Sequence, residues 1–383
     1  MATLGAAGIL HEDAGVTSPR KTPIKSLSLE EIEAKLVALG QKKYRAKQVA
    51  NWLYEKRVKS FAEMSDLPAA LREQLAAEFS FEDLKPIRKT GSSDTTQKFL
   101  FQLDDGSMIE SVLIPASPAL YGETSDRRTI CVSTQVGCAY GCKFCASGLD
   151  GFSRNLHAGE IVEQVLRVEE LSGERVNNIV FMGMGEPLAN YENLTRAITI
   201  LNAPWGMEIG ARHITVSTSG LAPRIRDLAD QPVPVRLAIS LHGATDDVRQ
   251  QIMPVNRKYP LAVLLDACGY WQSRKKKGLG FEYILINRVN DTPEQARTLA
   301  QHALRLNAKV NLIPYNKVEG LEWERPPLAR QDAFLRMVRN AGVVATIRRE
   351  KGHDIDAACG QLRLQTQRDF AGDKSFAETN NAS

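Results

Sequence analysis

Six short apolar runs recur along the second part of the chain, separated by polar turns and amphipathic stretches. Stretches such as "GEIVEQVLRVEEL" and "PEQARTLAQHALRL" have the apolar spacing of helices. Apolar strands that alternate with helices are typical of a parallel sheet buried on both faces. The pattern therefore predicts an α/β fold, an open, partial (β/α)6 barrel. The six runs are "TICVST" (129–134), "NIVFMG" (178–183), "HITVST" (213–218), "RLAISL" (236–241), "FEYILI" (281–286) and "VNLIPY" (310–315).

Polar and glycine-rich residues follow four of these runs directly. They are "GMGEP" after the second run, "STSG" after the third, "SLHG" after the fourth and "PYN" after the sixth. In a (β/α) barrel the chemistry lies at the C-terminal ends of the strands, because the loops that follow the strands meet there. Four such endings predict one shared site at this edge of the sheet.

The residues before the barrel predict a small all-helical domain over 24–86. Its first helix opens with a capping box from Ser28 to Glu31 and closes at Gly40. Another helix is expected to start near Pro68, with this proline in its first turn, where the missing N–H costs nothing.

A change of period follows the helical domain. The segment 87–123 contains two β-rich runs around Asp105-Gly106, a strong signal for a β-hairpin, which we expect as an extension of the barrel. We further expect residues 1–23 to form a flexible tail and 124–355 to form the barrel core. A C-terminal loop with a disordered polar tail is expected over 356–383.

The composition is ordinary for a soluble globular protein, with 43% hydrophobic and 25% charged residues among 383. No apolar run reaches the roughly 18 residues of a membrane span. The N-terminal stretch lacks the basic and apolar parts of a signal peptide. We therefore expect a cytoplasmic protein, a monomer with no membrane partner. In a reducing cytosol, clustered cysteines indicate metal binding or catalysis rather than structural disulfides.

Basic residues gather between Gly40 and Lys59, although the net charge of the whole chain is only +4. Only Glu55 opposes them. Such a density of positive charge suits a nucleic-acid phosphate backbone, while a solvated helix face is the alternative interpretation. The basic residues of this run are Lys42, Lys43, Arg45, Lys47, Lys56, Arg57 and Lys59.

Three of the six cysteines lie within "GCAYGCKFCASG", as Cys138, Cys142 and Cys145 in the spacing C-x-x-x-C-x-x-C. A structural zinc site takes four ligands, usually from paired C-x-x-C knuckles, and a ferredoxin-type cluster takes four cysteines. Three cysteines on an iron–sulfur cluster leave one iron without a protein ligand. A metal with an open position is able to bind a substrate.

The motif with Phe144 before its last cysteine resembles that of the radical S-adenosylmethionine (SAM) enzymes. The resemblance implies a [4Fe–4S] cluster bound by Cys138, Cys142 and Cys145, whose open iron chelates an exchangeable SAM. It also implies a partial barrel of the radical SAM type. The SAM-binding residues that it implies are Phe144, Gly185, Glu186, Ser217, Ser240, Leu241, His242 and Asn316.

A larger part of the chain, from about residue 25 to 365, resembles the RNA adenosine methyltransferases of the RlmN and Cfr type. The shared motifs are "TICVSTQVGC", "GFSRNL", "FMGMGEPL", "VSTSG", "ISLHG", "NLIPYN" and "DIDAACGQL". The RlmN type, which these motifs favour, methylates C2 of adenine 2503 in 23S rRNA and of adenine 37 in tRNA. The helical domain resembles the accessory RNA-binding domain of these enzymes.

This resemblance implies roles for three further residues. Cys359 would be methylated by a first SAM and carry the methyl group, and a second SAM would supply a radical, so that two are used per turnover. Glu110 would accept the C2 proton of a covalent RNA adduct. Cys131 would then release the product and leave a disulfide. A reducing partner such as flavodoxin with its reductase is implied, while Cys268 is expected in the core.

Two alternatives remain open from the sequence. A Cfr-type enzyme would methylate C8 of the same rRNA adenine and would use the same cysteines. An RNA-binding protein without catalysis could instead use the cysteine cluster as a structural zinc knuckle, with Cys131 or His157 as the fourth ligand.

Overall fold

The computed structural model describes residues 21–81, 84–92, 95–116, 125–148, 151–276, 278–317 and 321–348. Cys359 lies outside the described residues, as do the expected C-terminal loop and nearly all of the expected N-terminal tail. Within the described ranges, no helix combines the length and the apolar character that crossing a membrane requires.

A ten-stranded sheet runs through the described part of the molecule, in the order β14-β13-β12-β11-β10-β9-β6-β5-β4-β3, and two short two-stranded sheets accompany it. Within the large sheet, β6 and the strands from β9 to β14 pair in parallel. Each predicted run forms one of them, and β14 comes in addition. These strands are β6 (Arg128–Cys131), β9 (Asn178–Phe181), β10 (Ile214–Thr218), β11 (Arg236–Ser240), β12 (Leu279–Leu285), β13 (Lys309–Pro314) and β14 (Ala345–Ile347).

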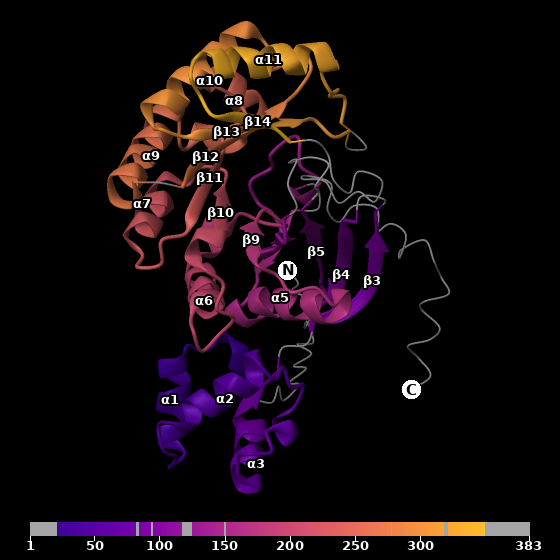
Figure 1. The fold of residues 1–383 in the computed structure, drawn as a ribbon, viewed down its shortest axis with the longest axis vertical. Helices are drawn as coiled ribbons and strands as arrows, with labels where there is room; N and C mark the ends of the chain where they lie inside the picture. The colour runs from indigo at the N-terminus through magenta and orange to yellow at the C-terminus, as the bar shows by residue number, and fades with distance from the viewer. Residues whose placement is uncertain are drawn as a thin grey trace, which may run out of the picture.

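Helices follow the parallel strands along the outer side of the curved sheet (Figure 1). Because β3 and β14 form the two ends of the sheet, the barrel is open, and the predicted fold class is confirmed. The helices of this part are α5 (Ala158–Ser172), α6 (Tyr191–Asn202), α7 (Ala222–Asp230), α8 (Asp246–Ile252), α9 (Leu261–Lys275), α10 (Pro293–Arg305) and α11 (Leu328–Asn340).

The predicted hairpin is present and continues the main sheet. Strands β4 (Gln97–Gln102) and β5 (Met108–Pro115) flank the turn at Asp105-Gly106, where Gly106 has a φ of 79°. Strand β5 pairs antiparallel with β6, so the extension belongs to the barrel wall. A third strand, β3 (Lys85–Gly91), escaped prediction because its residues are mostly exposed and show no apolar alternation.

The N-terminal domain contains α1 (Leu29–Ala38), α2 (Arg45–Tyr54) and α3 (Ala69–Glu78). The predicted capping box is present, with Ser28 and Glu31 bonding each other's backbone N–H. Two details differ from expectation. Pro68 has extended backbone angles and precedes the first turn of α3. The domain also has a short parallel strand pair, β1 (Thr22–Pro23) with β2 (Phe79–Ser80), which brings its two ends together.

Ion pairs join the helical domain to α5 of the barrel. Lys25 and Glu163 form a buried pair at 2.5 Å, and Lys59 pairs with Glu170 at 2.6 Å. Arg57 pairs with Glu169, whose side chain is buried. Within the run Glu55 is the one acidic residue, but in the structure glutamates of α5 pair with Arg57 and Lys59 and neutralise part of the run.

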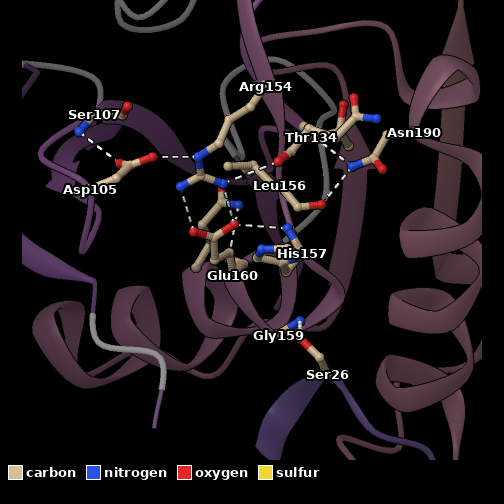
Figure 2. Close-up of polar contacts among 12 residues, drawn as sticks. Ser26, Asp105, Ser107, Thr134, Arg154, Leu156, His157, Gly159, Glu160 and Asn190 are labelled. Carbon is tan, nitrogen blue, oxygen red and sulfur yellow. Dashed lines mark hydrogen bonds and ion pairs between the residues drawn. The ribbon is translucent and has the colours of Figure 1, made fainter. Parts of the chain in front are cut away.

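One arginine links the hairpin, the segment after the cysteine motif and α5 (Figure 2). Arg154 lies on β8 (Phe152–Asn155), which pairs with β7 (Gln135–Gly137) across the base of the cysteine loop. Its guanidinium donates to Asp105 at 2.5 Å and holds both oxygens of Glu160 at 2.8 Å. These bonds of Arg154 hold β8, which follows the cysteine loop, against the hairpin and against α5.

The Arg154 guanidinium lowers the pKa of Asp105 from 3.8 to about 2. A depressed pKa stabilises the fold above the unfolded value, and this contribution is lost as pH falls from about 4 to about 2. Asp105→Asn should lower the free energy of unfolding at neutral pH by about 1 kcal/mol, since the pair is partly exposed. Urea unfolding between pH 2 and 6 measures the difference.

The difference between wild type and Asp105→Asn should shrink toward zero at the acid end. Asp332→Asn on α11, an exposed aspartate whose loss breaks no link of this kind, serves as the control and should show little difference throughout. A difference for Asp105→Asn that stays constant over this pH range would contradict the pairing.

Candidate active site

A pocket opens at the C-terminal ends of β9 to β12, where the sequence predicted a shared site. It brings together nine of the predicted residues, from the cysteine motif and from the three glycine- or serine-rich turns. They are Cys138, Cys142, Phe144, Cys145, Gly185, Glu186, Ser217, Ser240 and His242. These nine residues come from four separate segments of the chain and meet around one cavity, because the loops after parallel strands lie at the same edge of the sheet.

The cysteine loop leaves β7 and turns back toward β8. Gly137 and Gly141 have φ values of 73° and 59°, a region that glycine adopts without strain. The backbone N–H of Cys138 donates to Gly151 at 2.8 Å, which closes the loop at its base. In the middle of the loop, Lys143 N–H donates to Ile252 at the end of α8, at 3.0 Å.

Burial raises the pKa of Cys138 to about 12, and the pKa of Cys142 well above its usual value. Each thiol would add negative charge close to the others, so a bound metal is what favours their ionised form. In the described residues no three potential ligand side chains converge as they would around a single ion. The cysteines of a cluster bind different iron atoms, and three thiols lining one cavity fit such a donor set.

The turn "GMGEP" places Glu186 by close backbone contacts. A Cβ on Gly183 would lie 2.7 Å from Ser133, and one on Gly185 would lie 2.5 Å from Gln135, so both positions require glycine. The carboxylate of Glu186 accepts N–H bonds from Leu188 at 3.0 Å and from Ser219 at 2.7 Å. Burial raises its pKa, and these bonds partly offset the effect. A cation in the pocket would complete the stabilisation of this carboxylate.

His242 is buried and neutral. Burial, assisted by the positive charge of Arg249, lowers its pKa to about 3. Its Nδ1 accepts the backbone N–H of Ile284 at 3.0 Å, so the proton of the neutral ring is on Nε2. The ring packs edge-on against Phe144, with 4.6 Å between centroids. His242 therefore offers a hydrogen-bond donor and holds the aromatic residue of the cysteine loop.

Two predicted residues are not among those that line the pocket. The side chain of Leu241 is fully buried in the main core. Asn316 follows β13, and its side-chain oxygen accepts a bond from Arg325 at 2.6 Å. Glu282 of β12, which was not predicted from the sequence, is a buried carboxylate that lines the pocket and accepts a bond from Asn311. A glutamate inside the apolar run "FEYILI" was the available signal.

Glu110 and Cys131 lie on the inner face of the sheet. Val112 is directly opposite Cys131 in the β5–β6 pairing, and Glu110 is two residues before Val112 on the same face. The Glu110 side chain is fully buried, with Lys98 Nζ 3.5 Å from its Oε1. Cys131 is 6% exposed, and Met182 packs against its cluster and also lines the pocket. Neither residue lines the pocket; Cys131 is connected to it through Met182, and Glu110 lies on the same face of the sheet as Cys131.

Two cysteines remain, Cys268 and Cys359. Cys268 is fully buried on α9 and belongs to the main core, as expected. Cys359 lies outside the described residues. His157 is exposed just before α5, where its backbone N–H bonds Glu160, and it does not line the pocket.

Family models match two parts of the chain. The radical SAM superfamily matches residues 132–300, and the ribosomal RNA large subunit methyltransferase N-terminal domain matches 23–80. A radical SAM methyltransferase from Sphaerobacter thermophilus has the same fold, with a TM-score of 0.83 and 43% identity. The match covers 89% of this chain and 99% of that one.

Relatives of nearly full length are similar in sequence. A probable dual-specificity RNA methyltransferase RlmN from Akkermansia muciniphila is 53% identical, over 90% of this chain and 96% of the relative. One of the same description from Geobacillus kaustophilus is 47% identical, over 94% of this chain and 97% of the relative. The superfamily uses a [4Fe–4S] cluster and SAM. The chain belongs to the RlmN family of radical SAM RNA methyltransferases.

Proposed function

We propose that the protein methylates C2 of adenine 2503 in 23S rRNA and C2 of adenine 37 in tRNA. The observation that carries the proposal is the position of Glu110 and Cys131 on one sheet face, bordering the pocket that the three cysteines line. A base and a thiol beside a radical-generating centre suit a reaction that forms and then resolves a covalent adduct. The names of the relatives support two RNA substrates.

The chemistry of the substrate atom explains why a radical is needed. C2 of adenine lies between two ring nitrogens, so it is electron-poor and has no lone pair for polar displacement on SAM. A cluster with SAM supplies a 5′-deoxyadenosyl radical when both are bound, which is reactivity that amino-acid side chains lack.

The pocket suits SAM in its charge. SAM carries a sulfonium and an ammonium group, and the pocket lining includes the carboxylates of Glu186 and Glu282. In the proposal Cys138, Cys142 and Cys145 hold three irons, and the fourth is open. Glu186 binds the SAM ammonium, and Phe144 packs near the adenine. Ser217, Ser240 and His242 donate to the carboxylate or the ribose.

Three side chains then act on the methyl group and the RNA. The thiol of Cys359 takes a methyl group from a first SAM, and this group would then give one hydrogen atom to the radical that a second SAM supplies. The remaining methylene carbon bonds C2 of the adenine and joins protein and RNA, and the unpaired electron of the adduct would return to the cluster. Glu110, whose Oε1 lies 3.5 Å from Nζ of Lys98, accepts the C2 proton. Cys131 attacks the sulfur of Cys359 and releases the product, and a reductant of the flavodoxin type reduces the disulfide.

Replacing the resolving cysteine should trap the adduct. Cys131→Ala removes a small buried group, so the fold should lose only about 1 kcal/mol. The reaction should proceed to the carbon–carbon bond and stop there. Denaturing gel electrophoresis after reaction with RNA should show protein linked to RNA through Cys359, and RNase should reduce the link to a nucleotide-sized remnant.

Two variants are matched controls. Cys268→Ala removes an equally buried thiol from the core and should turn over repeatedly without an RNA-linked band. Cys131→Ala combined with Cys359→Ala lacks the carrier and should also show no band. Repeated turnover by the single Cys131→Ala variant, with no linked protein, would refute the assignment.

The helical domain provides a surface for RNA phosphates. Arg57 and Lys59 are occupied in ion pairs with α5, and Lys43 pairs with Glu33 at an exposed site. Lys42, Lys47 and Lys56 are exposed on or beside α2. We assign phosphate contacts to these three lysines, so the proposed surface is narrower than the basic run.

Reversing Lys42, Lys47 and Lys56 to glutamate should weaken RNA binding and flatten its dependence on salt, because fewer counterions are released. Titrations of RNA at several salt concentrations measure both effects. Reversing Lys309, Arg297 and Arg336, which are exposed on the barrel, serves as the control of equal charge and should change the salt slope less. Equal salt dependence of RNA binding for the wild type and the lysine variant would indicate that the basic run is a solvated helix face.

A further inference from the structure

Arg249 is a buried cation that the reaction described above does not use. It lies on α8 with no exposed surface. Its Nε donates to the carbonyl of Leu241 at 3.1 Å, Nη1 to the side-chain oxygen of Asn256 at 2.8 Å, and Nη2 to the carbonyl of Ser219 at 2.5 Å. All three acceptors are neutral.

The charge of Arg249 therefore lacks a direct counter-ion in the described part of the chain. None of the ion pairs found there includes it, and the nearby carboxylate of Asp246 reaches it only through Asn256. Three hydrogen bonds engage each nitrogen of the guanidinium once but do not compensate its charge. A buried charge without an opposite one costs several kcal/mol, so the position calls for a compensating group.

The place of Arg249 is directly behind the wall of the pocket. Two of its acceptors are backbone carbonyls of Ser219, which lines the pocket, and of Leu241, which lies between the pocket residues Ser240 and His242. A Cβ on Gly243 would lie 2.5 Å from the backbone nitrogen of Arg249, so glycine there permits the close approach of α8.

Helix α8 also touches the cysteine loop. Ile252, three residues after Arg249, accepts the backbone N–H of Lys143, the neighbour of Cys142. Arg249 thus lies within electrostatic reach of the cysteine loop.

The pocket that Arg249 backs gathers negative groups. The described residues that line it include three cysteines and the carboxylates of Glu186 and Glu282, and no lysine or arginine. Three thiolates outweigh the positive charge of an oxidised cluster core, and reduction adds an electron to the same site. Net charge nearby is one of the factors that set a cluster's reduction potential.

We propose that Arg249 is the internal counter-charge of the iron–sulfur cluster, and that it raises the cluster's reduction potential by stabilising the added electron. The inference rests on the proposed ligand set of Cys138, Cys142 and Cys145. Water is excluded from the guanidinium, so its interaction with the site is weakly screened. The three neutral acceptors orient the guanidinium without cancelling its charge.

The simpler account is that Arg249 only ties together the loops after β10 and β11. Four variants of the full chain separate the two roles. Arg249→Met removes charge and hydrogen bonds, and Arg249→Lys keeps the charge but not the set of three bonds. Asn256→Ala removes one bond partner and leaves the charge. Arg257→Met removes an exposed arginine eight residues further along.

The measurement is the midpoint potential of the anaerobically reconstituted cluster, followed by electron paramagnetic resonance. Arg249→Met should shift the reduction equilibrium at least tenfold toward the oxidised form, which is 59 mV for one electron. Arg249→Lys, Asn256→Ala and Arg257→Met should each shift it less than tenfold. If Arg249 acted only on the loops, the midpoint potential of Arg249→Met would equal that of the wild type. Alternatively, Arg249→Lys and Asn256→Ala would shift the midpoint potential as far as Arg249→Met does.

Should the methionine variant not fold, Arg249→Gln, which is neutral and keeps a hydrogen-bond donor, takes its place. A midpoint lowered tenfold or more supports the counter-charge, and one near that of the wild type contradicts it. The titration needs no RNA. A wild-type protein without a reducible cluster would contradict the proposed function, whereas equal midpoints for wild type and Arg249→Met would contradict only the role of Arg249.

Discussion

The antiparallel pairing of β5 with β6 connects the hairpin to the barrel, and the proposed chemistry depends on its register. Val112 opposite Cys131 places Glu110 and Cys131 on the inner face, next to the wall of the pocket. Because side chains alternate along a strand, a slip of one residue would turn Glu110 toward α5. The bond of Ser111 to Gln164 on α5, at 2.9 Å, holds the register from the outer face.

Buried charge is the second organising feature. The pocket contains two carboxylates and the cysteine loop, a neutral His242 and, behind its wall, the guanidinium of Arg249. Backbone N–H groups orient Glu186 and His242, backbone carbonyls help to orient Arg249, and the side chain of Asn311 bonds Glu282. Such a site is arranged before its ligands arrive, and it favours cationic and iron-containing groups over anions.

The fold was predictable from local patterns to a large extent. Apolar runs, the Asp105-Gly106 turn and the capping box of α1 are all signals that neighbouring residues carry. The pocket lining followed because parallel strands end at the same edge. Strand β3 was missed because its pairing, not its own sequence, makes it a strand.

What could not be predicted depends on contacts distant in the sequence. In the sequence, Arg57 and Lys59 belong to a basic run that suits RNA. In the structure, both form ion pairs with glutamates of α5. The roles of Arg249 and Glu282 could not be predicted, because they depend on the burial of both side chains at the pocket. Asn316 accepts a bond from Arg325 and is not among the residues that line the pocket, which its spacing in the sequence does not reveal.

The central claim is that the methyl group reaches C2 of adenine as a carbon radical carried on a cysteine. SAM with a fully deuterated methyl group, supplied over several turnovers with unmodified RNA, tests it by mass spectrometry of the nucleosides. The account predicts 2-methyladenosine that carries two deuteriums, because one is lost to the radical and a solvent proton takes its place. A product with all three deuteriums, or one methylated at C8, would contradict it.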